Sequence, residues 1–249
     1  MSNNSIKTII TMNQPSTFNN LENNKKTYRR IRKVIGYLGI FLPIILVVFS
    51  LIPFFETSIQ HSISKYYYTN LREIFTGTLC AIGLFLIRYV GFKSSSFWKN
   101  DNLLTNIAGY CAIGVAFFPT NPNILSEKIY TLLPFDNEFL GSVHYFLAAV
   151  FFVLLAIISI KVFPIGQETD DKTSKSIFDE NNLYRLCGYL MLLFLILVPL
   201  FSMLNIFSYS TITFEALTLF AFGISWLIKG RALGDKGTVG EKLYREINL

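Results

Sequence analysis

Four ionisable side chains lie in, or at the edges of, long apolar stretches of this chain: Arg72, Glu73, His144 and Glu215. Such groups are costly to place in lipid, so inside a membrane span they mark a functional site by default. If the four lie at one depth, they form an outward-facing polar cluster that could bind or remodel a lipid headgroup. Tyr66, Ser142 and Asn121 are expected near its rim. The predicted ligand-binding residues are Arg72, Glu73, His144, Glu215 and Tyr66.

A structural interpretation of the same residues stays open. Arg72 and Glu73 lie close enough to an interface to extend into water, and Glu215 could pair with Arg72 or His144 to hold helices together. Helical spacing favours an inward direction for Glu215, because it belongs to a stripe on one helix face. The stripe consists of Thr211, Glu215, Thr218, Phe222, Ser225 and Lys229.

Several enzyme classes require residues or motifs that this chain lacks. The chain has two histidines, His61 and His144, whereas a closed zinc site needs three or four His, Cys or acidic ligands. A Ser-His-acid set could be drawn from Ser142 or Ser64 with His144 and Glu215, but no G-x-S-x-G elbow is present. There is also no P-loop and no G-x-G-x-x-G motif. We therefore expect no metal and no cofactor, can assign no catalytic residue, and favour a non-enzymatic role.

The elements that must position these residues are membrane helices. Of the 249 residues 52% are hydrophobic and 15% charged, against roughly 25% charged in an ordinary soluble domain. A membrane crossing needs about 20 apolar residues. We predict an all-α, six-span bundle over residues 29–230, between a disordered polar tail, residues 1–28, and a basic tail, residues 231–249. The predicted spans are 34–55, 71–92, 103–119, 140–163, 184–204 and 211–228.

The distribution of positive charge predicts the orientation of these spans. With the N-terminus in the cytoplasm, 19 of the 22 Lys and Arg residues fall on the cytoplasmic side, as the positive-inside rule requires. The three on the outer side are Lys65, Arg72 and Lys128. Both termini are thus expected in the cytoplasm and the protein in a cell membrane of the bacterial cytoplasmic type. Because the basic residues flank apolar spans, we expect membrane lipids, and no nucleic acid, as partners.

A set of short motifs resembles a known family of six-helix membrane proteins. The carrying residues are Ser62, Ser64, Tyr66, Tyr67, Tyr68, Thr69, Arg72, Phe75, Arg88, Tyr89, Asn106, Ala108, Gly109 and His144. Over about residues 34–230 the chain is similar to the proteins collected as domain of unknown function 998 and, more distantly, to the DRAM-like autophagy-modulator and GPI-remodelling membrane proteins. The resemblance implies six helices, a polar outer segment before the second helix, and a link to membrane lipids.

Three functions are compatible with these sequence features. The first is lipid binding or remodelling at the polar cluster. The second is a non-catalytic structural or signalling role, in which the basic cytoplasmic segments meet anionic lipid or a protein partner. The third is a transporter or channel that uses the polar stripe of the last helix as one wall of a path.

Overall fold

The chain folds into a bundle of helices in the computed structural model, which describes residues 14–91, 93–120, 131–133, 138–165, 179–204 and 206–232. This part of the chain contains six α-helices. Their bounds are α2 Gln14–Ser50, α3 Arg72–Arg88, α4 Asp101–Phe117, α5 Glu138–Ile157, α6 Glu180–Leu204 and α7 Ser210–Lys229. Short helical turns join them: η1 Pro53–Phe55, η2 Ser64–Tyr68, η3 Phe97–Lys99 and the π-helical η4 Ile158–Val162.

Four of these helices are long and apolar enough to cross a membrane by themselves. They cover Asn23–Ser50, Glu138–Val162, Glu180–Leu204 and Ser210–Lys229 within the described residues. The helices α3 and α4 have 17 residues each, slightly fewer than the roughly 20 residues that span the hydrocarbon layer. Large apolar side chains are exposed on the outside of the bundle, among them Tyr110, Phe146 and Ile196. These features are typical of a protein that is embedded in a membrane.

Each predicted span overlaps one helix. The helix α2 ends at Ser50, before the predicted end at Phe55, and the short turn η1 follows it. The fourth span corresponds to α5 together with η4, and α6 is continuous through Pro199. From Gln14 on, the segment expected to be a disordered tail is helical and continuous with α2, because extending an existing helix needs no new nucleation. Residues 1–13 and 233–249 lie outside the described residues.

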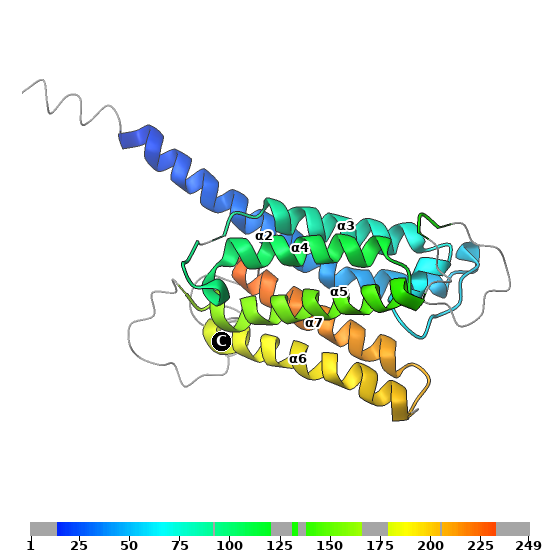
Figure 1. Cartoon of the computed structure of the whole chain (residues 1–249). Helices are drawn as coiled ribbons and strands as arrows, with labels where there is room; N and C mark the ends of the chain where they lie inside the picture. The colour runs from blue at the N-terminus through cyan, green and yellow to red at the C-terminus, as the bar shows by residue number, and fades with distance from the viewer. Residues whose placement is uncertain are drawn as a thin grey trace, which may run out of the picture.

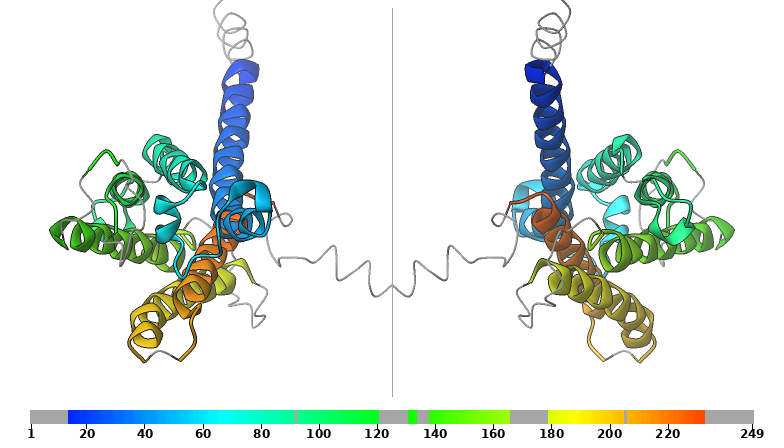
Figure 2. Two further views of the ribbon diagram at one scale, coloured as in Figure 1. Left: turned by 90° about the vertical axis from the view of Figure 1, so that its right-hand side faces the viewer. Right: turned by 90° about the vertical axis from the view of Figure 1, so that its left-hand side faces the viewer.

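The six helices form a ring in sequence order. Each packs against the next one along the chain, and α7 returns to pack against α2 (Figures 1 and 2). Glycines allow α2 and α7 to approach each other closely. A Cβ added at Gly36 of α2 would lie 2.8 Å from the carbonyl oxygen of Gly223 on α7, and one at Gly223 would lie 2.6 Å from that of Gly36. Small residues at such crossings let helix backbones approach each other closely.

The ring has two ends with different character. At one end lie η1, η2 and the starts of α3, α5 and α7; we call it the cavity end (right in Figure 1). At the other lie the starts of α4 and α6 and the end of α7; we call it the network end. Between the two ends, aromatic side chains fill the core: Phe151, Phe163, Phe222 and Trp226 are at most 1% exposed. The helix α6 diverges from α5 toward the cavity end (Figure 1).

Candidate functional site

A cavity of about 970 Å³ lies at the cavity end of the ring. Its polar lining comes mostly from the segment before η2, the loop before α7 and α7 itself. These residues are His61, Ser62, Ser64, Lys65, Ser202, Ser208, Ser210, Thr211, Glu215 and Thr218. Its apolar lining comes mainly from α5 and α6: Tyr145, Ala148, Ala149, Phe152, Leu195, Val198, Pro199 and Phe207. One side of the cavity is thus polar and the other apolar.

The polar side is held in place by contacts between residues 61–64 and the start of α7. The Ile212 amide donates to the carbonyl oxygen of His61 at 2.9 Å. The Nδ1 of His61 lies 2.7 Å from the carbonyl oxygen of Ser208, and since a carbonyl only accepts, this nitrogen carries the proton. The His61 ring also stacks on Tyr209, with 5.1 Å between ring centroids.

Glu215 is the acceptor around which this segment is arranged. The Ser62 hydroxyl lies 3.0 Å from both carboxylate oxygens, and the backbone amide of Ile63 donates to Oε2 at 2.6 Å. The hydroxyls of Ser62 and Ser64 lie 2.8 Å apart. Hydrogen bonds to an ionised carboxylate are stronger than those between neutral groups. The carboxylate therefore fixes the turn that carries Ser62 and Ser64 against α7.

The other predicted site residues have separate surroundings. The Arg72 guanidinium donates through Nε to the Tyr67 carbonyl at 2.8 Å and lies 5.3 Å from the Tyr67 ring centroid. Tyr66 is fully buried, and its hydroxyl accepts from Ser50 at 3.0 Å, which joins η2 to the end of α2. Glu73 is exposed. The cavity is lined by one of the five predicted ligand-binding residues, Glu215.

His144 joins α5 to the end of α4. It is 3% exposed, and its Nδ1 lies 2.6 Å from the Phe118 carbonyl oxygen. Ser142 donates to the Glu138 carbonyl at 3.1 Å, within its own helix. The Ser-His-acid arrangement considered from the sequence is therefore not assembled, because Ser64 contacts Ser62 and the Glu215 carboxylate holds the Ser62 turn. The predicted rim residue Asn121 lies outside the described residues.

Next to the cavity end, Tyr68 connects η2 to the segment after α4. Its hydroxyl donates to the carbonyl oxygen of Thr120. Burial raises the pKa of Tyr68 to about 12, since burial disfavours the charged phenolate. The hydroxyl therefore stays protonated at neutral pH and keeps its donor role.

One interpretation made from the sequence needs revision. The structural alternative paired Glu215 with Arg72 or His144, whereas its partners are Ser62 and Ile63. No local sequence pattern indicates this contact, because loop residues 62–63 and helix residue 215 are far apart along the chain. The cavity residues that sequence reasoning left out are mainly Ser62, Lys65 and the apolar wall of α5 and α6. The hint to Ser62 and its neighbours was the polar outer segment before the second helix that the family resemblance implies.

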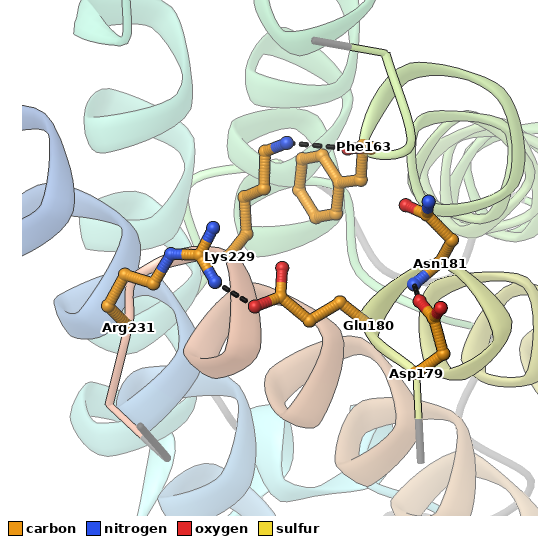
Figure 3. A network of polar contacts seen from close by, with 6 residues as sticks. All are labelled: Phe163, Asp179, Glu180, Asn181, Lys229 and Arg231. Carbon is orange, nitrogen blue, oxygen red and sulfur yellow. Dashed lines mark hydrogen bonds and ion pairs between the residues drawn. The ribbon is translucent and has the colours of Figure 1, made fainter. Parts of the chain in front are cut away.

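A buried group of charged residues occupies the network end and was not anticipated. Glu180, 3% exposed, forms an ion pair with Arg231 just after α7 (Figure 3). The Lys229 ammonium donates to the Phe163 carbonyl at 2.5 Å (Figure 3) and lies 5.5 Å from the Tyr184 ring centroid. The sequence predicts Lys229 and Arg231 here as residues that set the orientation of the helices. It does not predict the buried carboxylate of Glu180 that pairs with Arg231.

A second set of contacts at the network end joins α2, α3 and α4. The Arg32 guanidinium donates to the Tyr89 hydroxyl at 2.5 Å, and this hydroxyl donates to the carboxylate of Asp101 at 2.9 Å. Asp101 is 4% exposed. We call Arg32, Tyr89, Asp101, Glu180, Lys229 and Arg231 the end network. It contains three cations and two carboxylates within a largely apolar bundle.

Within the part of the chain that the structure describes, no three His, Cys, Asp or Glu side chains are grouped so that they could hold a metal ion. The arrangement at the cavity end offers hydroxyls, one carboxylate and one ammonium group beside an apolar wall. These groups can bind a polar headgroup and an attached hydrocarbon chain. They offer no assembled nucleophile and base.

Comparison with known proteins adds one match. The model of a family described as "Protein of unknown function (DUF998)" matches residues 34–229. This range runs from α2 to the last residue of α7 and includes both the cavity and most of the end network. No curated protein and no solved structure matches the chain.

Proposed function

From the premise that the chain belongs to the DUF998 family of proteins of unknown function, we propose that it is a multi-pass protein of a cell membrane that binds a lipid in the cavity beside Glu215. All six helices cross the membrane in this proposal, and both termini lie in the cytoplasm. The clustering of 19 of 22 Lys and Arg residues on that side supports this orientation. The cavity end is then the outer end.

The observation that carries the proposal is the division of the cavity into a polar and an apolar side. Ala148 and Ala149 of α5 and Val198 of α6 offer small apolar contacts, against which an acyl chain can pack. Lys65, Ser64 and Glu215 line the polar side, where a headgroup can form hydrogen bonds and ion pairs. Ligand pockets of roughly 300–1,000 Å³ with an apolar wall and few polar groups are typical small-molecule sites.

The charges on the polar side favour a zwitterionic phospholipid headgroup. The Lys65 ammonium is a donor suited to a phosphate. An ionised carboxylate offers roughly four acceptor positions, so the contacts of Glu215 with Ser62 and Ile63 leave capacity for an ammonium group.

Native mass spectrometry of the gently solubilised protein tests it. Ala149→Trp fills the cavity, and Leu84→Trp adds the same side chain on α3, where Leu84 is 57% exposed. We expect a discrete phospholipid adduct on the wild type and on Leu84→Trp, and at least a tenfold weaker adduct on Ala149→Trp. Glu215→Gln should weaken the adduct, while the exposed Glu73→Gln should not.

Equal adducts on all variants would overturn the proposal. So would the absence of any adduct after incubation with phosphatidylethanolamine and phosphatidylglycerol. Either result would turn attention to a structural or signalling role in which the basic cytoplasmic segments meet anionic lipid or a protein partner.

A further inference from the structure

The polar face of α7 continues beyond the floor of the cavity. Thr218 lines the cavity and is 1% exposed, and Ser225 two turns further on is fully buried. The Ser225 hydroxyl lies 2.9 Å from that of Ser159 on η4. Lys229, one turn beyond Ser225, reaches the end network. Polar side chains on one buried face thus run along α7 from the cavity to the opposite end of the bundle.

Two barriers interrupt this polar face. The first consists of Phe151, Phe222 and Trp226, whose rings contact one another in the core, with 6.1 to 6.2 Å between neighbouring centroids. The second is the end network, in which Arg231 and Glu180 join the end of α7 to the start of α6 (Figure 3). Lys229 adds a link from α7 to Phe163, just after η4. The bundle therefore holds a cavity at one end, a layer of aromatic rings in its middle and a group of charged residues at the other end.

A π-helical turn lies at the level of the second barrier. Residues Ile158–Val162 form η4, which directly continues α5. Such turns are rare, and they occur frequently at functional sites. Here the turn supplies Ser159, the partner of Ser225, and is followed by Phe163, whose carbonyl accepts from Lys229. A change between π-helical and α-helical winding at η4 would shift both contacts together.

Buried ion pairs are a costly way to hold a bundle. Apolar residues of similar volume often stabilise a protein as well or better. Stability alone therefore does not explain a buried ion pair at this position. The contact between Glu180 and Arg231 joins the start of α6 to the end of α7 at the network end. The helix α6 diverges from α5 toward the cavity end (Figure 1), where residues of both helices line the cavity.

We propose that the buried polar face of α7 is the wall of a transmembrane passage, which the aromatic layer of Phe151, Phe222 and Trp226 and the end network close in the described arrangement. The end network is its inner gate. In the described arrangement the passage is open at the cavity end. Breaking the contacts of Glu180 and Lys229 opens the network end as the cavity end narrows. The cargo is the phospholipid, or its headgroup, that the cavity binds. The identity of the cargo rests on the proposed function, whereas the movement of the gate does not.

Thiol labelling of two reporter positions tests the gate. The three native cysteines are replaced by serine, and a single cysteine is placed either at Thr218 or at Ser225. Each protein is reconstituted in nanodiscs, so that a small charged thiol reagent reaches both faces. The gate is weakened by the double variant Glu180→Gln, Arg231→Gln, which leaves no buried charge of the pair unpartnered. Arg185→Gln, an exposed position on α6, is the matched control.

We expect the double variant to speed labelling of Ser225→Cys at least tenfold and to slow labelling of Thr218→Cys several-fold. Exchanging the charges, Glu180→Arg with Arg231→Glu, should restore slow labelling of Ser225→Cys. Arg185→Gln should change neither rate. If Ser225→Cys does not fold, Ser159→Cys reports the same position from η4.

Opposite changes in the labelling rates of the two reporters distinguish a gate from a general loss of packing in the bundle. If both reporters were labelled faster, the network would be only structural and the passage would be overturned. Unchanged rates in the folded double variant, or in Lys229→Met as a second variant, would overturn it as well. These outcomes do not depend on lipid adducts, so a failed gate and a failed lipid site are distinguishable.

Discussion

At the scale of single residues, Glu215 contributes both to the cavity and to the packing of the segment before η2. Its carboxylate holds the amide of Ile63 and the hydroxyl of Ser62, so it acts both as a wall of the cavity and as the anchor of the segment before η2. Glu73 has the same chemistry but is exposed. Comparing substitutions of Glu215 and Glu73 separates the effect of removing a carboxylate from the effect of removing it at the cavity.

We predict that Glu215→Ala lowers thermal stability in detergent and that Glu73→Ala does not. The alanine leaves the Ile63 amide without its acceptor, and an unsatisfied buried group costs about 1–3 kcal/mol. For a chain of this size that corresponds to a fall in Tm of several degrees, at roughly 2–4 °C per kcal/mol. Equal Tm values for the two variants would show that the segment is held by other contacts.

The Tyr68 hydroxyl gives a prediction in alkaline solution. Its pKa in the folded protein is raised to about 12 from the ordinary value of 10.0, so the folded state favours the protonated form. The stability that this hydroxyl contributes should be fully present below pH 10 and be lost as the pH rises toward 12. The difference in Tm between wild type and Tyr68→Phe, measured against pH, should therefore shrink only above pH 10. A difference that shrinks at lower pH would contradict the raised pKa.

At the scale of elements, the helix crossing that closes the ring, between α7 and α2, is one of the close backbone contacts in the bundle. The backbones of α2 and α7 meet at Gly36 and Gly223, where an added Cβ would lie under 3.0 Å from a backbone oxygen. Backbone cannot give way as a flexible side chain can, so the crossing fixes how α7 stands beside α2. Because Glu215 and Lys229 both lie on α7, this crossing also positions the cavity and the end network.

Gly223→Ala should therefore destabilise the bundle by about 1–3 kcal/mol, as overpacking of a core does. The matched control is Gly77→Ala on α3, where an added Cβ meets nothing within 4 Å. Because alanine is the better helix former by up to about 1 kcal/mol, Gly77→Ala should be neutral or slightly stabilising. Thermal unfolding followed by circular dichroism measures both. An intact Tm for Gly223→Ala would mean that α2 and α7 separate at little cost.

At the scale of the whole molecule, the ring brings the first and last helices together. The start of α2 and the end of α7 lie at the network end (Figure 1), where most of the Lys and Arg residues of the described part of the chain are found. In the proposed orientation this end faces the cytoplasm, and the segment 51–71 faces outward. The positive charge that determines orientation and the charges of the end network then come partly from the same residues.

Single cysteines can check this orientation in intact cells. We expect Ser58→Cys, which is exposed at the cavity end, to react with an impermeant thiol reagent before the cells are permeabilised. Cysteines at Ser5 and Thr238 should react only afterwards. The reverse pattern, or labelling of one terminus without the other, would contradict the topology and remove the assignment of the cavity to the outer face.

The sequence by itself determined the helices, and the 19 Lys and Arg residues on one side of the predicted spans predict their orientation. Helix formation in lipid follows from local apolar length, because every backbone group must find its partner within its own segment. Helical periodicity also singled out Glu215 and the polar face of α7. These features depend on residues close together along the chain.

Only the tertiary structure decided which polar groups meet. Arg72, His144 and Glu215 all come from helices that start at the cavity end, but each contacts a different backbone segment: Tyr67, Phe118 and Ile63. Which groups meet depends on how α3, α5 and α7 are rotated about their axes and where the loops dock. The pairing of Glu180 with Arg231 likewise required α6 and α7 to lie side by side. Contacts of this kind join residues distant in sequence, so helical spacing cannot reveal them.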